Sequence, residues 1–480
     1  MSTYCRSLLK IRTLKAEIKR MSSTIFALSS GLSRCAVAMI RVSGPDSKLV
    51  LSQIARFKKL PSPRKAFVRK IVHPSTNEHL DTGIVLWFPS PNSYTGEDSC
   101  ELHLHGSPAV VKAVLNALEN VEPRGCLRHA MAGEFTRRAY LNGKLDLCQV
   151  EGLADLLQAQ TDAQRVQALR NVDGHLSRLS RTWAEKLTQC VARLEAFIDF
   201  SEEHADVAQD NTLETARQRA QELAKELEAQ LGDGRRGERL RAGVRVALLG
   251  RPNAGKSSIF NMLCRREAAI VSPKAGTTRD IVEASLDIAG FPVQLGDTAG
   301  LSRRAKDPVE RKGVARARSW AATSDLLLLV GDCRRGVHEL EQLSATLPAD
   351  LPRLAVLNKC DLLEKEDLQI LAEKCQTSRE PFLLVSCRTG SGVPELVKAL
   401  AQQVAPLCSS EATAGSLISE RQQRTLGQCL ESVQQATLHE EPDIMAEYLR
   451  RALVHLGHLV GHVSTEDLLD RIFRDFCVGK

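Results

Sequence analysis

The 480-residue sequence lacks features that would assign it to several common protein classes. Its longest obvious apolar run spans residues 326–330, far short of the roughly 18 residues of a membrane span, so we expect no membrane segment. None of its 14 cysteines forms a Cys-x-x-Cys pair, which favours reduced thiols in a non-oxidising compartment over disulfides or a zinc site. The net charge of +7 is modest, and permits an RNA partner without demonstrating one.

The centre of the sequence contains a complete phosphate-binding motif. Five of the six residues Val244–Leu249 are apolar, which predicts a strand buried on both faces. Residues 250–257, GRPNAGKS, match the P-loop pattern and precede an apolar helical pattern. Lys256 would contact the β and γ phosphate oxygens, and the Ser257 hydroxyl would bind Mg²⁺. The nucleotide-binding residues predicted here are Asn253, Ala254, Gly255, Lys256, Ser257 and Ser258.

Motifs farther along the chain predict GTP as the nucleotide. The carboxylate of Asp361, in the sequence NKCD, can accept hydrogen bonds from the N1–H and amine of guanine, which adenine lacks. Residues 276–280, GTTRD, and 297–300, DTAG, stand where the γ-phosphate-sensing segments of GTPases belong. The residues predicted from these motifs are Thr278, which would bind Mg²⁺, Asp297, which would hold Mg²⁺ through water, Thr298, Ala299, Gly300, Asn358, Lys359, Asp361, Ser386 and Cys387.

One expected residue is missing from this set. Switch-type GTPases place a water-orienting glutamine directly after the Asp-x-x-Gly element, and this sequence has Leu301 there. A leucine side chain cannot polarise water. Either the site hydrolyses GTP slowly, or another group supplies the chemistry.

The N-terminal residues 1–24 carry six Lys and Arg residues against the single acid Glu17. A basic, acid-poor, amphipathic leader is typical of a mitochondrial transit peptide, so we expect a mitochondrial location. The alternative is a disordered tail before a second start at Met21.

The rest of the chain divides by its hydrophobic pattern. Residues 36–42, 83–88 and 100–105 predict strands and residues 109–118 a helix, which together indicate a small α+β domain. His103 and His105 lie two apart on one of these strands, where surface histidines are more common than metal ligands. Apolar residues recur at helical spacing from residue 145 to 230 and again after Pro406. We expect an acidic break at residues 199–210 and a flexible entry to the next domain at residues 232–237.

The predicted fold is therefore a multidomain α/β and α+β protein. A P-loop GTPase (G) domain is inserted into one helical domain and is preceded by an α+β head domain. The predicted boundaries are residues 1–23 for the leader, 24–142 for the head, 143–240 and 408–480 for the two helical parts, and 241–407 for the G domain.

Several sequence stretches resemble the MnmE/TrmE family of tRNA modification GTPases. These are FPSPNSYTGED, GEFTRRAYLNGKLDL, GRPNAGKSS, AGTTRD, DTAGL and the ending FCVGK, within residues 24–480. With the leader, the chain resembles a mitochondrial member. The resemblance implies a homodimer joined through head domains that bind 5,10-methylene- or 5-formyl-tetrahydrofolate. The positions that match the folate site are Arg41, Glu101, Lys144 and Lys480.

The resemblance also implies a substitute for the missing glutamine. Members of the family use K⁺ when two G domains meet, and the matching positions are Asn253, Ser272, Lys274 and Thr277, with Ser272 and Thr277 also counted as nucleotide-binding. The water-positioning glutamate matches Glu310. Cys477 precedes Lys480 by three residues, so we hypothesise a catalytic role for it in tRNA modification; the alternative is a small buried hydrophobe.

The family's activity supplies the expected function. An FAD-dependent flavoprotein and this protein would together install a taurinomethyl- or carboxymethylaminomethyl-type group at carbon 5 of the wobble uridine, position 34, of mitochondrial tRNA. One alternative is a ribosome-assembly GTPase of the Era or Der type, which would need an RNA-binding KH domain that the sequence pattern after the G domain does not indicate. Another is a membrane-remodelling scaffold, which would need a membrane-binding segment beyond the leader.

Overall fold

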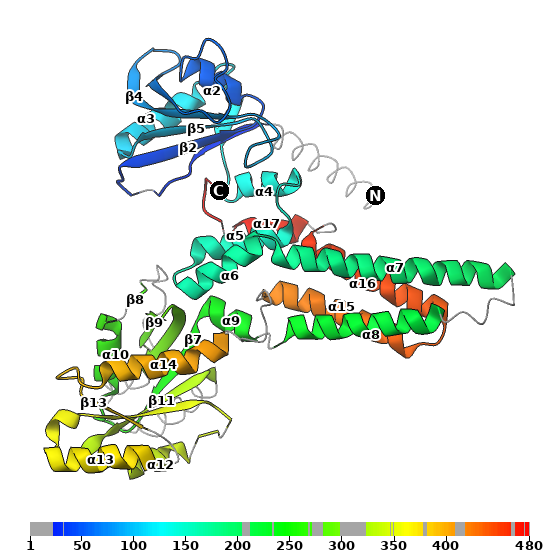
Figure 1. The fold of residues 1–480 in the computed structure, drawn as a ribbon. Coiled ribbons are helices and arrows are strands. Elements are labelled where there is room, and N and C mark those ends of the chain that lie inside the picture. Colours follow the sequence, from blue (N-terminus) through cyan, green and yellow to red (C-terminus); the bar gives the residue numbers. More distant parts are fainter. Residues whose placement is uncertain are drawn as a thin grey trace, which may run out of the picture. The chain divides into compact units, whose positions relative to one another are not determined.

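The structure, a computed structural model, forms two compact units, Met1–Ala154 with Val460–Lys480, and Asp155–Leu459 (Figure 1). None of the helices among the described residues combines the length and apolar character that a membrane crossing requires. The leader lies outside the described residues. The structure describes residues 23–31, 33–203, 212–232, 235–266, 269–270, 282–297, 323–345, 347–348, 350–377, 382–408, 418–461, 466–474 and 476–479.

The first unit contains a six-stranded sheet in the order β3-β4-β5-β2-β1-β6. Its neighbouring strands are antiparallel, except that β6 runs parallel to β1. Helices α2 and α3 pack their buried residues against one face of the sheet. The strands and the helix predicted for this region are confirmed. The elements are β1 (Thr24–Leu28), β2 (Val37–Ser43), α2 (Ser47–Gln53), β3 (Phe67–Val72), β4 (His79–Phe88), β5 (Ser99–His105), α3 (Pro108–Glu119) and β6 (Leu127–His129).

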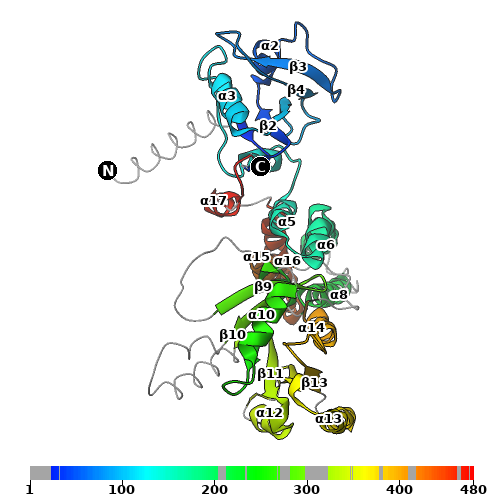
Figure 2. The same cartoon turned by 90° about the vertical axis from the view of Figure 1, so that its left-hand side faces the viewer.

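The C-terminal segment completes this first unit. Helix α17 (Glu466–Arg474) leads into a tail that lies next to the sheet (Figures 1 and 2). Helices α4 (Glu134–Leu141) and α5 (Leu147–Gln158) follow the sheet strands in the same unit. Val478 forms a β-bridge with Ala132, and Ser29 Oγ donates a hydrogen bond of 2.8 Å to the carbonyl oxygen of Gly479. Beneath the tail, a core cluster joins residues distant in sequence: Leu147, Val150, Leu469, Phe473 and Phe476.

The second unit contains a seven-stranded sheet in the order β13-β12-β11-β7-β10-β9-β8. The five strands from β13 to β10 are parallel, and β9 and β8 form an antiparallel edge. Its strands are β7 (Val244–Leu249), β8 (Ala269–Ile270), β9 (Val282–Ile288), β10 (Phe291–Asp297), β11 (Leu326–Asp332), β12 (Arg353–Asn358) and β13 (Phe382–Val385).

Helices cover both faces of this sheet, as the apolar strand β7 predicted. Val246 and Leu248 belong to a core shared with α10 (Lys256–Arg266) and α14 (Val393–Cys408). Ala247 and Leu249 point to the other core, shared with α12 (His338–Ser344) and α13 (Lys365–Thr377). Because successive side chains of a strand point to opposite faces, one short segment organises both cores.

Long helices from both sides of the sheet segment pack together. The side chain of Gln434 on α15 donates a 2.8 Å hydrogen bond to Glu228 on α8, and Trp183 on α7 donates one of 3.1 Å to Glu226 on α8. Figure 1 shows α8 alongside α15. These elements are α6 (Asp162–Val172), α7 (His175–Glu203), α8 (Thr212–Leu231), α9 (Arg235–Ala242), α15 (Glu420–Leu438) and α16 (Pro442–Val460).

Two expectations for this region are wrong in part. Helix α7 continues through Asp199 to Glu203, because acidic residues do not by themselves end a helix and glutamate, at positions 202 and 203, is a good helix former. The segment expected to be a flexible entry contains the start of α9 at Arg235. Leu240 of α9 is buried, and Gly237 fits within the helix where a Cβ atom would approach the Ile418 carbonyl oxygen to 2.7 Å.

Packing of the C-terminal tail leads to a prediction about the stability of the first unit. Phe476 is 5% exposed, so Phe476→Ala should reduce the free energy of unfolding of this unit by about 3–5 kcal/mol through lost burial and a cavity. Val478→Ala, at a 58% exposed position of the same tail, should change it by about 0.5 kcal/mol or less. Chemical denaturation with hydrogen exchange of β1 amides measures both, and equal effects of the two variants would contradict the packing.

Candidate functional site

The P-loop lies between β7 and α10, at the carboxyl ends of the parallel strands. A side chain at Gly250 would collide with the carbonyl oxygen of Val330 on β11, so the close approach requires glycine. Lys256 is 7% exposed and its ammonium donates hydrogen bonds to the carbonyl oxygens of Gly250, at 2.7 Å, and Arg251, at 2.9 Å. The loop is therefore already curled around the cation that would meet the nucleotide phosphates.

The predicted base-recognition residues meet beside this loop. Asn358 is 2% exposed and donates from Nδ2 to the Ala254 carbonyl oxygen at 3.3 Å. Its Oδ1 accepts a hydrogen bond from the Cys387 backbone N–H at 3.3 Å. Ser386 Oγ donates to the Asp361 carboxylate at 2.6 Å, and Asp361 is exposed. Because that partner is a neutral hydroxyl, no described cation competes with the N–H groups of a ligand for this carboxylate.

An ion pair that the sequence analysis missed holds the neighbouring lysine. Lys359 has a left-handed backbone, φ 69°, and its ammonium donates to Asp332 Oδ2 at 2.7 Å and to the Asn253 carbonyl oxygen at 2.5 Å. Arg334 donates to both carboxylate oxygens of Asp332, at 3.0 and 2.6 Å. The hydrogen bonds from Arg334, together with Lys359, hold the pKa of Asp332 well below its usual range. The sequence did contain a signal for this ion pair, because Asp332 is an acidic residue at the end of the apolar strand β11.

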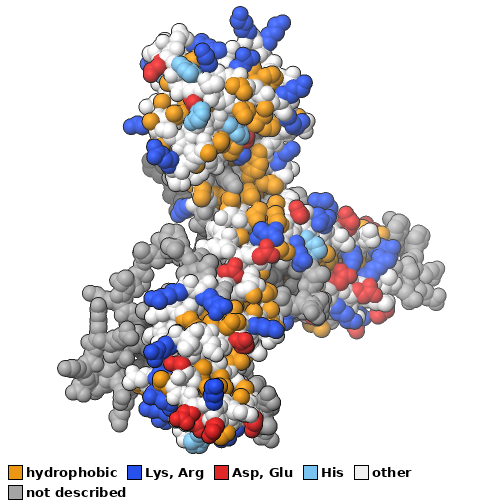
Figure 3. All heavy atoms as spheres, turned by 60° about the vertical axis from the view of Figure 1, so that its left-hand side comes forward, with side chains coloured by type: hydrophobic (Ala, Val, Ile, Leu, Met, Phe, Trp, Pro, Cys, Tyr) orange, Lys and Arg blue, Asp and Glu red, His pale blue; other side chains and the backbone are white. Residues whose placement is uncertain are grey.

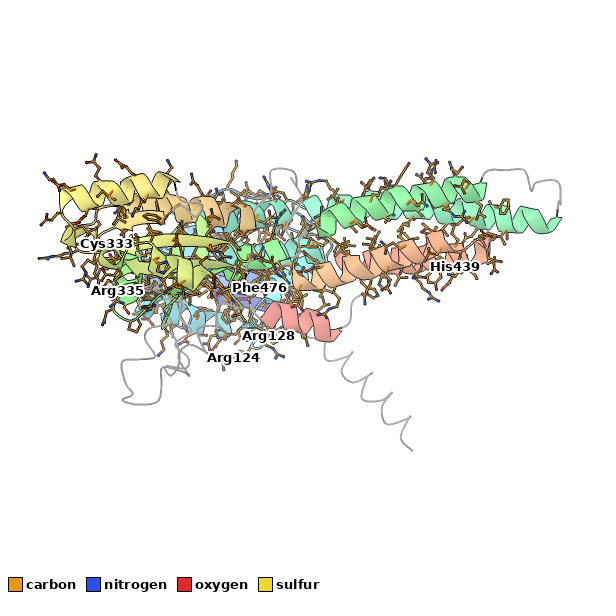
Figure 4. The ribbon with its side chains drawn as sticks, turned by 90° about the horizontal axis from the view of Figure 1, so that it is seen from below. Arg124, Arg128, Cys333, Arg335, His439 and Phe476 are labelled. Carbon is orange, nitrogen blue, oxygen red and sulfur yellow. The ribbon has the colours of Figure 1, made fainter. Side chains whose placement is uncertain are left out.

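Two thiols lie against this base site. Cys333 is buried and donates a hydrogen bond from Sγ to the Lys359 carbonyl oxygen at 3.0 Å, and burial raises its pKa to about 11. Burial also raises the pKa of Cys387 to about 11. Figure 4 labels Cys333 with Arg335, the two ends of the short turn that contains Arg334. Both thiols are therefore protonated at neutral pH and contribute packing around the base site.

Several predicted residues lie outside the described residues: Ser272, Lys274, Thr277, Thr278, Thr298, Ala299, Gly300, Glu310 and Lys480. Asp297 is described as the last residue of β10, paired in register with Leu248 of the P-loop strand. Ser257 and Ser258 lie in the first turn of α10. Among the described residues, no group of three or more His, Cys, Asp or Glu side chains could hold a metal ion. The magnesium and potassium sets remain predictions, because most of their residues lie outside the described part of the chain.

A second candidate site lies on the sheet of the first unit. Arg41 of β2 and Glu101 of β5 are directly opposite in register, and Arg41 donates to Glu101 Oε1 at 3.2 and 3.1 Å. The Arg41 guanidinium also lies 5.0 Å from the centre of the Tyr94 ring. The Lys144 ammonium donates to the Pro91 carbonyl oxygen at 3.3 Å, in the loop that carries Tyr94. The structure thus brings Arg41 and Glu101 together and places Lys144 against the same loop.

Cys477 lies in the docked C-terminal tail. Its thiol is free and the residue is exposed, and its carbonyl oxygen accepts a hydrogen bond from the Gly133 N–H at 3.4 Å. The alternative reading, a small buried hydrophobe, is therefore wrong. The neighbouring Phe476, labelled in Figure 4, is the residue next to Cys477 whose side chain is buried.

Comparisons with known proteins cover nearly the whole chain. Residues 147–477 match the model described as MnmE helical domain, and residues 24–144 match GTP-binding protein TrmE N-terminus. A human protein named 5-taurinomethyluridine-[tRNA] synthase subunit GTPB3, mitochondrial, is 46% identical and covers 99% of this chain and 97% of its own length. The tRNA modification GTPase MnmE of Rhodopseudomonas palustris is 44% identical, with 95% of this chain and 99% of that protein covered. The resemblance found in the sequence motifs is confirmed: this chain belongs to the MnmE/TrmE family.

Proposed function

We propose that this chain hydrolyses GTP and acts in mitochondria in tRNA modification. With an FAD-dependent flavoprotein, it installs a taurinomethyl- or carboxymethylaminomethyl-type group at carbon 5 of the wobble uridine. The observation that carries the GTP assignment is the Asp361 carboxylate, held by Ser386 beside the curled P-loop. The tRNA assignment rests on 46% identity across nearly the full length of relatives named for that modification.

The described residues have distinct roles in this proposal. Lys256 exchanges its carbonyl partners for phosphate oxygens, and Ser257 would bind Mg²⁺, which neutralises phosphate charge. Asp332 positions Lys359, whose stem would pack beside the guanine ring. We also propose that the G domain is inserted into a helical domain. The hydrogen bond between α8, which precedes the G domain, and α15, which follows it, supports this proposal.

Hydrolysis requires a replacement for the glutamine that Leu301 displaces. We propose K⁺ at Asn253, Ser272, Lys274 and Thr277, with Glu310 positioning water, when two G domains pair. Asn253 is exposed at a left-handed position, φ 66°, and its side chain has no hydrogen bond to another described residue. A monovalent cation there would stabilise charge developing between the β and γ phosphates.

The head domain is proposed to bind a tetrahydrofolate, which supplies a one-carbon unit, and to join two copies into a homodimer. Arg41, Lys144 and Lys480 would pair with folate carboxylates. Glu101 would accept hydrogen bonds from the pterin amino edge. Arg41 and Glu101 already form an ion pair with each other. A folate that contacts both side chains must therefore replace this ion pair with its own contacts as it binds. The Era or Der alternative loses support, because the matched family models are those of MnmE and TrmE.

The first prediction tests the base site. Asp361→Asn should weaken GTP binding on the order of 10- to 100-fold, because a charged acceptor for two N–H groups becomes partly a donor. The same variant should gain affinity for xanthosine triphosphate. Asp367→Asn, on exposed α13, is the matched control and should bind GTP as the parent does. Nucleotide titration measures all three, and unchanged GTP affinity in Asp361→Asn would remove Asp361 from the site.

The second prediction tests hydrolysis. GTP turnover should require K⁺, exceed turnover in Na⁺ and rise with protein concentration as G domains pair. Glu310→Ala should lower kcat on the order of 10²-fold while GTP affinity stays unchanged. Equal rates in Na⁺ and K⁺ would refute the cation site, and full turnover in Glu310→Ala would refute the role of Glu310.

The third prediction tests the whole function by complementation. Cells without this chain should lose the carbon-5 modification of mitochondrial wobble uridine, and the wild-type chain should restore it. Cys477→Ser should fail to restore it while melting temperature and GTP turnover stay normal, because the exposed thiol contributes little packing. Modified-uridine content by mass spectrometry decides both: full modification without the chain refutes the function, and full rescue by Cys477→Ser refutes only the role of Cys477.

A further inference from the structure

The segment between α2 and β4 carries an unusual concentration of positive charge. No Asp or Glu occurs between Asp46 and Glu78. Within residues 56–70 there are seven Lys and Arg residues, all exposed, which we call the α2–β3 basic strip: Arg56, Lys58, Lys59, Arg64, Lys65, Arg69 and Lys70. Figure 3 shows lysine and arginine side chains gathered at the end of this unit that carries α2 and β3.

The charges of the basic strip are not compensated within the described part of the chain. Arg56 donates to the Asn77 side-chain oxygen and Arg64 to the Asn92 carbonyl oxygen at 2.7 Å, both neutral acceptors. None of the seven forms an ion pair with a described carboxylate. Other cations of this unit do: Lys48 pairs with Asp98 at 2.8 Å, and Arg138 with Glu97 at 3.0 Å. The strip therefore presents an uncancelled positive field to solvent.

The aromatic residues of the segment point into the protein. Phe57 is 8% exposed, with the Arg69 guanidinium 4.3 Å from its ring centre, and Phe67 packs against the core. The strip therefore offers no exposed aromatic platform on which nucleobases could stack. Its free groups are ammonium and guanidinium donors, which suit phosphate oxygens and carry no sequence preference.

The basic strip adjoins the candidate folate site. The Arg64 backbone N–H donates to the Trp87 carbonyl oxygen at 2.9 Å, and its side chain reaches Asn92. The loop that contains Asn92 continues to Tyr94, which lies beside Arg41. A polyanion bound along the strip would pass next to the residues proposed to hold the one-carbon donor.

We propose that the α2–β3 basic strip binds the phosphate backbone of the RNA substrate and guides it past the head-domain site. This inference rests on the proposed function, in which the substrate is a tRNA. A second copy of the chain is a poor occupant, because a twofold interface would bring seven cations against seven. A membrane surface is also disfavoured, because the cations lie on a loop and an edge strand instead of an amphipathic helix.

The test removes three charges that have no hydrogen-bond partner among the described residues. The variant K58Q/K59Q/K65Q should bind unmodified mitochondrial tRNA on the order of 10-fold more weakly at about 0.1 M salt. The slope of log affinity against log salt should fall in magnitude by about 2–3, roughly one for each lost phosphate contact. The matched control K225Q/K365Q/K398Q removes the same charge from exposed positions of the other unit and should bind within about twofold of wild type.

Other outcomes overturn the proposal. Wild-type affinity and salt slope in the strip variant would refute it, as would an equal loss in the control, which would indicate only net charge. Loss of binding to phosphatidylserine vesicles with tRNA binding intact would assign the strip to a membrane, and a change in oligomeric state would assign it to a second copy. Strip-dependent tRNA binding by a chain that cannot restore uridine modification would refute the proposed function and leave this inference standing.

Discussion

The side chain of Asn358 holds together the parts of the nucleotide site. It lies at the end of β12, buried, and joins the Ala254 carbonyl oxygen of the P-loop to the Cys387 N–H of the loop after β13. The phosphate-binding and base-binding segments come from different strands, and this one amide fixes their separation. Without this side chain, the Ala254 carbonyl oxygen and the Cys387 N–H would lose these hydrogen bonds, at a cost of about 0.5–1.5 kcal/mol each.

Charged side chains add a second set of contacts beside the Asn358 amide. Lys359 contacts both the P-loop carbonyl of Asn253 and the Asp332 carboxylate, and Arg334 covers that carboxylate from the solvent side. The two left-handed residues, Asn253 and Lys359, are joined by the same hydrogen bond, so each conformation helps to maintain the other. These contacts within the protein fix the P-loop relative to the base-binding loop, which reduces the ordering that nucleotide binding must oppose.

Local sequence pattern was sufficient to predict strands β2, β4, β5 and β7 and the strand-loop-helix context of the P-loop, because each depends on residues close together in the chain. Local sequence pattern could not predict the order of the strands within each sheet, because that order depends on contacts between distant residues. The Asp332–Lys359 pair forms because β11 and β12 are parallel neighbours, and Arg41 meets Glu101 because β2 and β5 share a register. The α9 helix was missed because the glycines near it suggested a flexible segment, whereas the tertiary contact with Ile418 makes one of them suitable within a helix.

The docked C-terminal tail has a consequence for how the protein is made. Leu147 and Val150 are translated before the whole second unit, yet Phe473 and Phe476, which pack with them, are translated after it. The cluster under the tail therefore cannot form until α17 and Phe476 have been synthesised, although the sheet can pack with α2 and α3 earlier. A product truncated before α17 keeps the apolar surface of Leu147 and Val150 uncovered, which chaperones and proteases recognise. Phe476, which completes this cluster, is directly followed by Cys477. The chain therefore gains the residue that completes the cluster and the exposed thiol together. A chain truncated before α17 therefore lacks Cys477 and is also one that quality control can detect.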